Sequence, residues 1–128
     1  MTVYLTVGEV LAIHNDLIVR YGGSHGVRDP GLLEAAVFRP QSGYYPDLIA
    51  QAAALWESLA QNHPFVDGNK RVGFAVTYTF LSVNGFDIAP DAEEIFAFID
   101  GLYGRGRFNA AQLEAWLRDA VVDRSNSL

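Results

Sequence analysis

Residues 63–71 read His-Pro-Phe-Val-Asp-Gly-Asn-Lys-Arg and lie between two stretches that both have the pattern of a helix. Within nine residues they combine a histidine, a carboxylate, a Gly-Asn turn and two adjacent cations. The preceding residues 47–62 repeat apolar side chains at the 3.6-residue spacing of a helix with one buried face. Pro64 lacks a backbone N–H and disfavours helical geometry in the residue before it, so this helix is predicted to end at His63.

The following residues 69–84 predict the central helix of the fold. After Arg71 they are almost entirely apolar or aromatic, and Gly85 provides a left-handed stop. A helix with so few polar side chains is expected at the centre of the core. The loop before it then lies at the mouth of the core, and the unpaired N–H groups of the helix start point into that loop. Such a helix start attracts anions, phosphate above all.

Two residues of the loop suit the chemistry of phosphoryl transfer. His63 titrates near neutrality and can accept a proton from an attacking hydroxyl. Asp67 is a hard oxygen ligand for Mg²⁺, which normally arrives with the phosphates of a nucleotide and needs few protein ligands. Both residues also have ordinary structural interpretations, a helix C-terminus for the histidine and a turn for the aspartate.

The rest of the loop predicts an anion site. Gly68 has no Cβ, so a phosphate could approach the backbone amides of Gly68, Asn69 and Lys70. Lys70 would add a point charge and Arg71 a fork of donors. A turn alone does not need two adjacent cations at a helix start, where the helix dipole disfavours them. This combination favours a functional interpretation of the loop.

Composition predicts one globular domain over residues 1–128, because the chain is 50% hydrophobic and 12% aromatic. Zero cysteines exclude a disulfide framework and a thiolate metal site, which is compatible with a reducing cytoplasm. A net charge of −6 argues against direct nucleic-acid binding. No apolar stretch reaches the roughly 20 residues of a membrane span, and the first residues lack a signal-peptide pattern. The sequence therefore predicts a soluble, cytoplasmic protein.

Helix signals also occur outside the central stretch. Capping patterns predict helices over residues 6–21, 30–38 and 109–121. An acidic first turn predicts another over residues 90–102, broken by glycines at 101, 104 and 106. His14 is expected at the surface or partly buried on the first helix, and His25 in a loop. Residues 3–5 could pair with residues 86–88 as a minimal sheet. Residues 124–128 are polar and expected to fray.

Residues 63–71 match the Fic signature, His-x-Phe-x-(Asp/Glu)-Gly-Asn-x-Arg, at every fixed position. The ending Asn-Lys-Arg resembles the Doc (death-on-curing) branch of this family. The stretch Gly-Val-Arg-Asp-Pro-Gly-Leu-Leu-Glu at residues 26–34 and the size of the chain resemble it too. The resemblance implies an all-α fold, a single compact Fic-type domain of about six helices with negligible sheet. The motif loop would join two core helices.

The resemblance to Fic enzymes implies transfer of part of a nucleotide to a hydroxyl of a target protein. By position, His63 would deprotonate that hydroxyl, Phe65 would anchor the loop, and Asp67 would hold Mg²⁺. The anion cradle and the phosphate ligand would come from the last four motif residues, namely Gly68, Asn69, Lys70 and Arg71.

Lys70 decides between two reactions. AMP-transferring members of the family have glycine at this position, and a lysine should obstruct their nucleotide pose. Doc-like members are held to bind ATP reversed and to transfer its γ-phosphate to elongation factor Tu, which arrests translation. We therefore expect a toxin kinase that uses ATP and Mg²⁺. An AMP-transferase and a non-catalytic nucleotide-binding module remain as alternatives.

The sequence also bears on control and on target binding. Many Fic enzymes are restrained by a helix of pattern (Ser/Thr)-x-x-x-Glu-(Gly/Asn), and no Ser or Thr here lies four residues before a Glu. We therefore expect a separate antitoxin of the Phd kind that folds as a helix into an apolar groove. The loop over residues 39–46 matches, by position, the flap that aligns a target's backbone in Fic-fold enzymes. A plain connector is an equally good interpretation of that loop.

Overall fold

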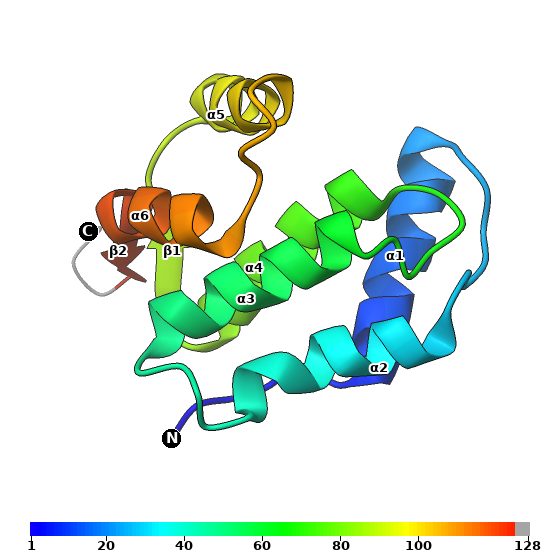
Figure 1. Cartoon of the computed structure of the whole chain (residues 1–128), viewed down its shortest axis with the longest axis horizontal. Helices are drawn as coiled ribbons and strands as arrows, with labels where there is room; N and C mark the ends of the chain where they lie inside the picture. Colours follow the sequence, from blue (N-terminus) through cyan, green and yellow to red (C-terminus); the bar gives the residue numbers. More distant parts are fainter. Residues whose placement is uncertain (125–128) are drawn as a thin grey trace.

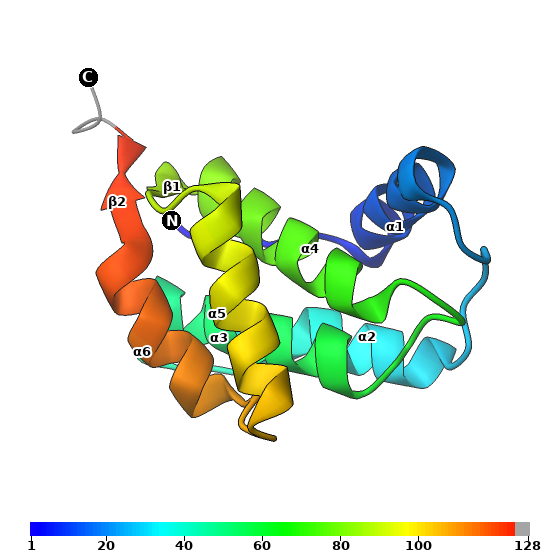
Figure 2. The ribbon, with the colours of Figure 1, turned by 90° about the horizontal axis from the view of Figure 1, so that it is seen from above.

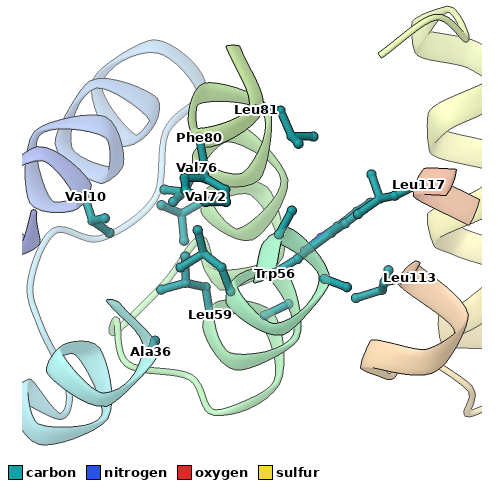
Figure 3. Packing of buried hydrophobic residues seen from close by; sticks show 14 of the residues in the cluster. Val10, Ala36, Trp56, Leu59, Val72, Val76, Phe80, Leu81, Leu113 and Leu117 are labelled. Carbon is teal, nitrogen blue, oxygen red and sulfur yellow. The ribbon is translucent and has the colours of Figure 1, made fainter. Parts of the chain in front are cut away.

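Two helices, α3 (Leu48–Gln61) and α4 (Asn69–Val83), form the centre of the computed structural model, which describes residues 1–124. Figure 3 shows Leu59 of α3 packed towards Val72 and Val76 of α4, while Trp56 of α3 extends towards Leu113 and Leu117, and all are fully buried. A Cβ at Gly73 would lie 3.3 Å from the Ala60 methyl, so this glycine lets the two helices approach closely. The loop that joins α3 to α4 is therefore held at both ends by the core.

The other elements flank this pair (Figure 1). Together they are α1 (Val7–Tyr21), α2 (Pro30–Phe38), the 3₁₀ turn η1 (Arg39–Gln41), β1 (Phe86–Ile88), α5 (Ala92–Gly104), α6 (Ala110–Ala120) and β2 (Val121–Asp123). Every α-helix except α4 begins with a side-chain cap. Thr6, Asp29 and Asn109 are caps as the sequence predicts. Asp47 and Asp91, expected within the first turns of their helices, are caps as well. The predicted all-α fold of about six helices with negligible sheet is confirmed.

The arrangement around α4 positions the site. Figure 2 shows α4 between α1 and α5, with its first residues at the same end of the molecule as the motif loop. Buried apolar side chains from all six helices join in one cluster. Within residues 1–124, no helix is long and apolar enough to cross a membrane.

The predicted strand pairing is wrong. β1 pairs antiparallel with β2, with Phe86 opposite Asp123 and Ile88 opposite Val121. Residues 3–5 do not join this sheet, and the side-chain amide of Asn84 binds the backbone of Val3. Its oxygen accepts the Val3 N–H at 2.8 Å and its nitrogen donates to the Val3 carbonyl at 2.9 Å.

Two helix boundaries also differ from the prediction. Val121, expected on the apolar stripe of the last helix, is extended and begins β2 because α6 ends at Ala120. Gly101 does not break α5, which continues to Gly104. The side chain of Arg105 lies against Gly101, 3.3 Å from where a Cβ would be. Of the segment expected to fray, residues 125–128 lie outside the described residues.

The loop over residues 39–46 is a connector and not a flap beside the motif. It precedes the first residue of α3 whereas the motif follows the last one, so the two loops lie at opposite ends of that helix (Figure 1). Because α3 has 14 residues, it is about 20 Å long, and this length separates the two loops. The Tyr45 hydroxyl accepts a hydrogen bond from Arg39, which also pairs with Glu57 at 2.8 Å. The loop is thus tied to the core by its own residues.

Candidate functional site

The motif loop pairs with a segment that is distant in sequence. Val27 and Phe65 form an antiparallel bridge, and the Val66 N–H donates to the Gly26 carbonyl at 3.0 Å. The Pro64 carbonyl accepts the N–H groups of Arg28 and Asp29 at 2.8 and 3.0 Å. The segment over residues 26–29, and not the loop over residues 39–46, therefore lies along the motif.

Arg28 also caps the helix that enters the loop. Its Nε donates to the His63 carbonyl at 2.6 Å and its Nη2 to the Asn62 carbonyl at 2.9 Å. Carbonyls at a helix C-terminus lack intrahelical partners, and a cation there also favours the helix dipole. The helix consequently ends at Gln61 with Asn62 as its cap, two residues earlier than predicted. His63 is left in a left-handed conformation with φ of 50°.

Asn69 turns its side chain into the protein and organises the loop. It is 7% exposed, its Oδ1 accepts the Phe65 N–H at 3.0 Å, and its Nδ2 donates to the Phe65 carbonyl at 3.0 Å. These two bonds fix the orientation of the amide. Asn69 can therefore offer only its backbone N–H to an anion in this conformation.

The Asn69 amide also faces the imidazole of His63. Its Nδ2 lies 3.4 Å from His63 Nδ1, and an amide nitrogen can only donate. The contact favours the tautomer that has its proton on Nε2, whereas a base acting through Nε2 must have that nitrogen free. At 3.4 Å the bond is weak, so an exchange of tautomer on substrate binding costs little. His63 itself is exposed and lines the groove beside the motif.

His14, expected at the surface or partly buried, is a buried part of the site at 4% exposure. Its ring stacks on Phe65 with centroids 3.8 Å apart and planes 6° from parallel. Its Nε2 donates to the Asp67 carbonyl at 2.8 Å. The apolar ring of Phe65, 1% exposed, is thus anchored as predicted, with a histidine of α1 as its stacking partner.

The carboxylate of Asp67 is held by backbone amides. Its Oδ2 accepts the Ser24 N–H at 3.1 Å and its Oδ1 accepts the Gly68 N–H at 2.8 Å. The bond from Ser24 and then the bond from Gly68 lower the pKa of the Asp67 carboxyl below its ordinary value. Gly23 makes room for this contact, because a Cβ there would lie 2.7 Å from Oδ2. Asp67 is therefore an ionised, exposed oxygen donor at neutral pH.

The start of α4 presents unpaired donors. Gly68 is the N-cap in a left-handed conformation with φ of 76°, and no side chain caps the helix. The first helical bond runs from the Val72 N–H to the Gly68 carbonyl at 2.9 Å, so the three preceding amides lack helical partners. Those amides belong to Asn69, Lys70 and Arg71, whereas the Gly68 amide is bound by Asp67. The open amides are thus one residue further along than those that the sequence predicts for an anion cradle.

The two cations of the motif rest on tyrosine rings. Lys70 Nζ lies 4.1 Å from the ring centroid of Tyr103, and the Arg71 guanidinium lies 4.7 Å from that of Tyr21. Both distances fit cation–π contacts. Lys70 and Arg71 are exposed and line the same groove as His63 and Asp67.

This groove, with a volume of about 1620 Å³, runs between α1, α4 and α5. Its walls away from the motif are largely apolar, and Ile13, Leu17, Phe74, Phe96 and Ile99 contribute to them. Phe96 is 64% exposed despite its size. The motif residues form one end of the groove, so the candidate site and an apolar surface are continuous.

The residues fit a magnesium ion that arrives with a nucleotide. Within residues 1–124, no three His, Cys, Asp or Glu side chains gather as a cage for a metal. Magnesium commonly uses one or two carboxylates together with substrate phosphates, and Asp67 is an ionised carboxylate beside a helix start suited to phosphate.

A family model described as "Fic/DOC family" matches residues 4–81 of this chain. The chain belongs to the Fic/DOC family. A protein named "Toxin Doc" from Mycolicibacterium smegmatis (strain ATCC 700084 / mc(2)155) is 48% identical over 96 residues, which cover 71% of this chain and 72% of that protein. "Protein kinase doc" from Escherichia phage P1 is 33% identical over 94 residues, which cover 70% of this chain and 75% of that one.

The match to the Fic/DOC family model includes the motif and the helices that hold it, while α5 and α6 lie beyond it. Several residues of the site were not predicted from the sequence, namely His14, Tyr21, Ser24, Arg28 and Tyr103. For Arg28 the signal was present, because it lies within the stretch 26–34 that resembles Doc proteins. The others lie near the motif through tertiary contacts that no local pattern encodes.

Proposed function

We propose that this chain is the toxin of a toxin–antitoxin module and a cytoplasmic protein kinase that transfers the γ-phosphate of ATP to a hydroxyl of a target protein. The observation that carries the proposal is Lys70. It belongs to the first turn of α4, whose amides are open, and stands where AMP-transferring Fic enzymes have a glycine. The names of the two relatives, a toxin and a protein kinase, support the same class. By the resemblance to Doc, the target is elongation factor Tu.

In the proposed reaction the hydroxyl oxygen attacks the γ-phosphorus and the bond to the bridging β–γ oxygen breaks. His63 takes the hydroxyl proton, and ADP leaves with the electron pair of the broken bond. Lys70, Arg71 and the amides of the α4 start bind phosphate oxygens and stabilise the charge that develops on them. Asp67 would hold Mg²⁺, which neutralises phosphate charge when bound.

The choice between γ-phosphate and AMP transfer is tested with ATP labelled at the α or the γ position. The wild type should pass γ-label, and not α-label, to a protein of a host lysate, with a mass gain of about 80 Da and not about 329 Da. Lys70→Gly should lose γ-transfer, and with the bulk removed it can gain weak α-transfer. Lys70→Met is the matched control, because it removes the charge but keeps the bulk. It should lose γ-transfer without gaining α-transfer.

Transfer of α-label by the wild type would assign the chain as an AMP-transferase. Binding of nucleotide without label on any protein would assign it as a non-catalytic nucleotide-binding module. Undiminished γ-transfer by Lys70→Gly would refute the role of the ammonium.

A Phd-like antitoxin is the proposed partner, and the groove between α1, α4 and α5 is its proposed site. The groove is largely apolar away from the motif and ends at the motif, so an amphipathic helix in it would cover both. Phe96→Asp should weaken the toxin–antitoxin complex by about tenfold or more, because burial of a Phe side chain contributes about 1.5–3 kcal/mol. Phosphate transfer should be unchanged. Tyr44→Asp, in another exposed aromatic position, is the control and should leave the complex intact. An unchanged affinity of Phe96→Asp would place the antitoxin elsewhere.

A further inference from the structure

Tyr103, near the C-terminal end of α5, has its ring between two groups. On one side Phe108 stacks with it, at a centroid distance of 4.3 Å and an interplanar angle of 12°. Since that face is covered, the ammonium of Lys70, 4.1 Å from the ring centroid, lies over the other face. Tyr103 and Phe108 both lie beyond the residues that match the family model.

The contact is made by a neutral ring. Burial raises the pKa of Tyr103 to about 12, so its hydroxyl keeps its proton across the physiological range. That hydroxyl is buried and has no hydrogen-bond partner among residues 1–124. The contact with Lys70 is therefore made by the aromatic face of Tyr103 and not by its hydroxyl.

Lys70 would otherwise be unrestrained. Its side chain is exposed, and among the described residues no carboxylate lies within ion-pair distance of its ammonium. A lysine has a flexible four-carbon stem and loses rotamer entropy when it is fixed. A carboxylate partner would compete with a phosphate for the ammonium, whereas the face of a tyrosine restrains the cation and leaves its full charge.

We propose that Tyr103 is a positioning residue that holds the ammonium of Lys70 ready for phosphate beside the start of α4. The functional part of this inference rests on the proposed role of Lys70 in binding phosphate. The positional part does not, and it can be tested without any activity.

The positional test uses the fact that Lys70 is the sole lysine of the chain. Protein labelled with ¹³C and ¹⁵N in lysine gives one set of side-chain NMR signals. The ring current above an aromatic face moves the Lys70 ε-methylene protons upfield in the wild type and in Tyr103→Phe. In Tyr103→Leu, which keeps an apolar side chain but has no ring, that shift should be lost. Tyr21→Leu removes the ring under Arg71 and is the matched control, with the lysine signal unmoved.

The functional test measures KM for ATP and kcat for γ-phosphate transfer in the same proteins. A cation–π contact of this kind corresponds to a loss of about twofold to thirtyfold in Tyr103→Leu, chiefly in kcat/KM for ATP, whereas Tyr103→Phe should stay within about twofold of the wild type. A general structural defect would instead be seen as a lowered melting temperature of Tyr103→Leu, because the stack on Phe108 is lost with the ring.

Each outcome has a meaning. A wild-type lysine signal without an upfield shift, or the same shift in Tyr103→Leu, overturns the inference. So does a Tyr103→Leu variant whose lysine signal moves but whose transfer is unchanged. A wild type with the shifted signal but no phosphate transfer refutes the proposed kinase function and leaves the position of Lys70 on Tyr103 established.

Discussion

His14 is the residue whose replacement tests the architecture of the site most directly. The change His14→Ala removes a ring that is 4% exposed, a stack on Phe65 at 3.8 Å and a hydrogen bond of 2.8 Å to the Asp67 carbonyl. The aromatic pair contributes about 0.5–1.5 kcal/mol beyond its burial, and the hydrogen bond a net 0.5–1.5 kcal/mol. With the cavity left by the ring, we expect a loss of about 2–4 kcal/mol in the free energy of unfolding.

The assay is urea unfolding followed by far-UV circular dichroism, with thermal melting alongside. For a domain of this size, 1 kcal/mol corresponds to about 3–5 °C, so His14→Ala should melt about 6–20 °C below the wild type. His14→Phe keeps the stacked ring but not the donor, and it should lose only about 1 kcal/mol. Asn15→Ala, a neighbouring exposed position on α1, is the control and should be unchanged or slightly more stable.

A His14→Ala protein that unfolds within about 0.5 kcal/mol of the wild type would refute this reasoning. It would mean that the motif loop keeps its conformation without support from α1. Equal losses in His14→Ala and His14→Phe would show that the hydrogen bond, and not the ring, holds the loop.

Three further perturbations have defined outcomes. His63→Ala should lower γ-phosphate transfer by about 10²- to 10⁴-fold. The melting temperature and the ATP affinity should stay close to those of the wild type, because the side chain is exposed. An unfolded variant would instead indicate a structural histidine. Asp67 has a folded-state pKa below its unfolded value, so its contribution to stability is present above about pH 4 and is lost as the pH falls through the folded pKa. The melting-temperature gap between the wild type and Asp67→Asn should therefore close below about pH 4, and a gap constant from pH 7 to 2.5 would contradict this. Arg28→Lys should destabilise the protein nearly as much as Arg28→Ala, by about 0.5–1.5 kcal/mol in urea unfolding. The reason is that the ammonium of a lysine cannot reproduce the two guanidinium bonds to the carbonyls of residues 62 and 63. Full retention of stability in Arg28→Lys would show that charge alone caps α3.

Local patterns in the sequence were sufficient for the helices and for the position of the motif loop. Capping residues such as Thr6 and Asp29 act within three or four residues, and the helix period repeats within a single element, so both can be read without the fold. The same holds for Pro64 as the end of a helix and for Asn69 as the first residue of the next one, although Arg28 shortens α3 by two residues. Family membership followed from nine residues at fixed spacing, and the family model and the two relatives support it.

The partners of the motif residues were decided by the tertiary structure. His14 lies 53 positions before Asp67, Tyr103 lies 33 after Lys70, and β1 pairs with a strand that begins 35 residues after its own first residue. Contacts over such distances depend on how α1 and α5 pack against α4, and a propensity or a cap carries no information about that packing. The sequence by itself therefore determined which groups the site can use and where the chain turns. The packing of α1 and α5 decided which of these groups are buried, which amides are open and where the ammonium of Lys70 rests, because each depends on neighbours that only the folded chain brings together.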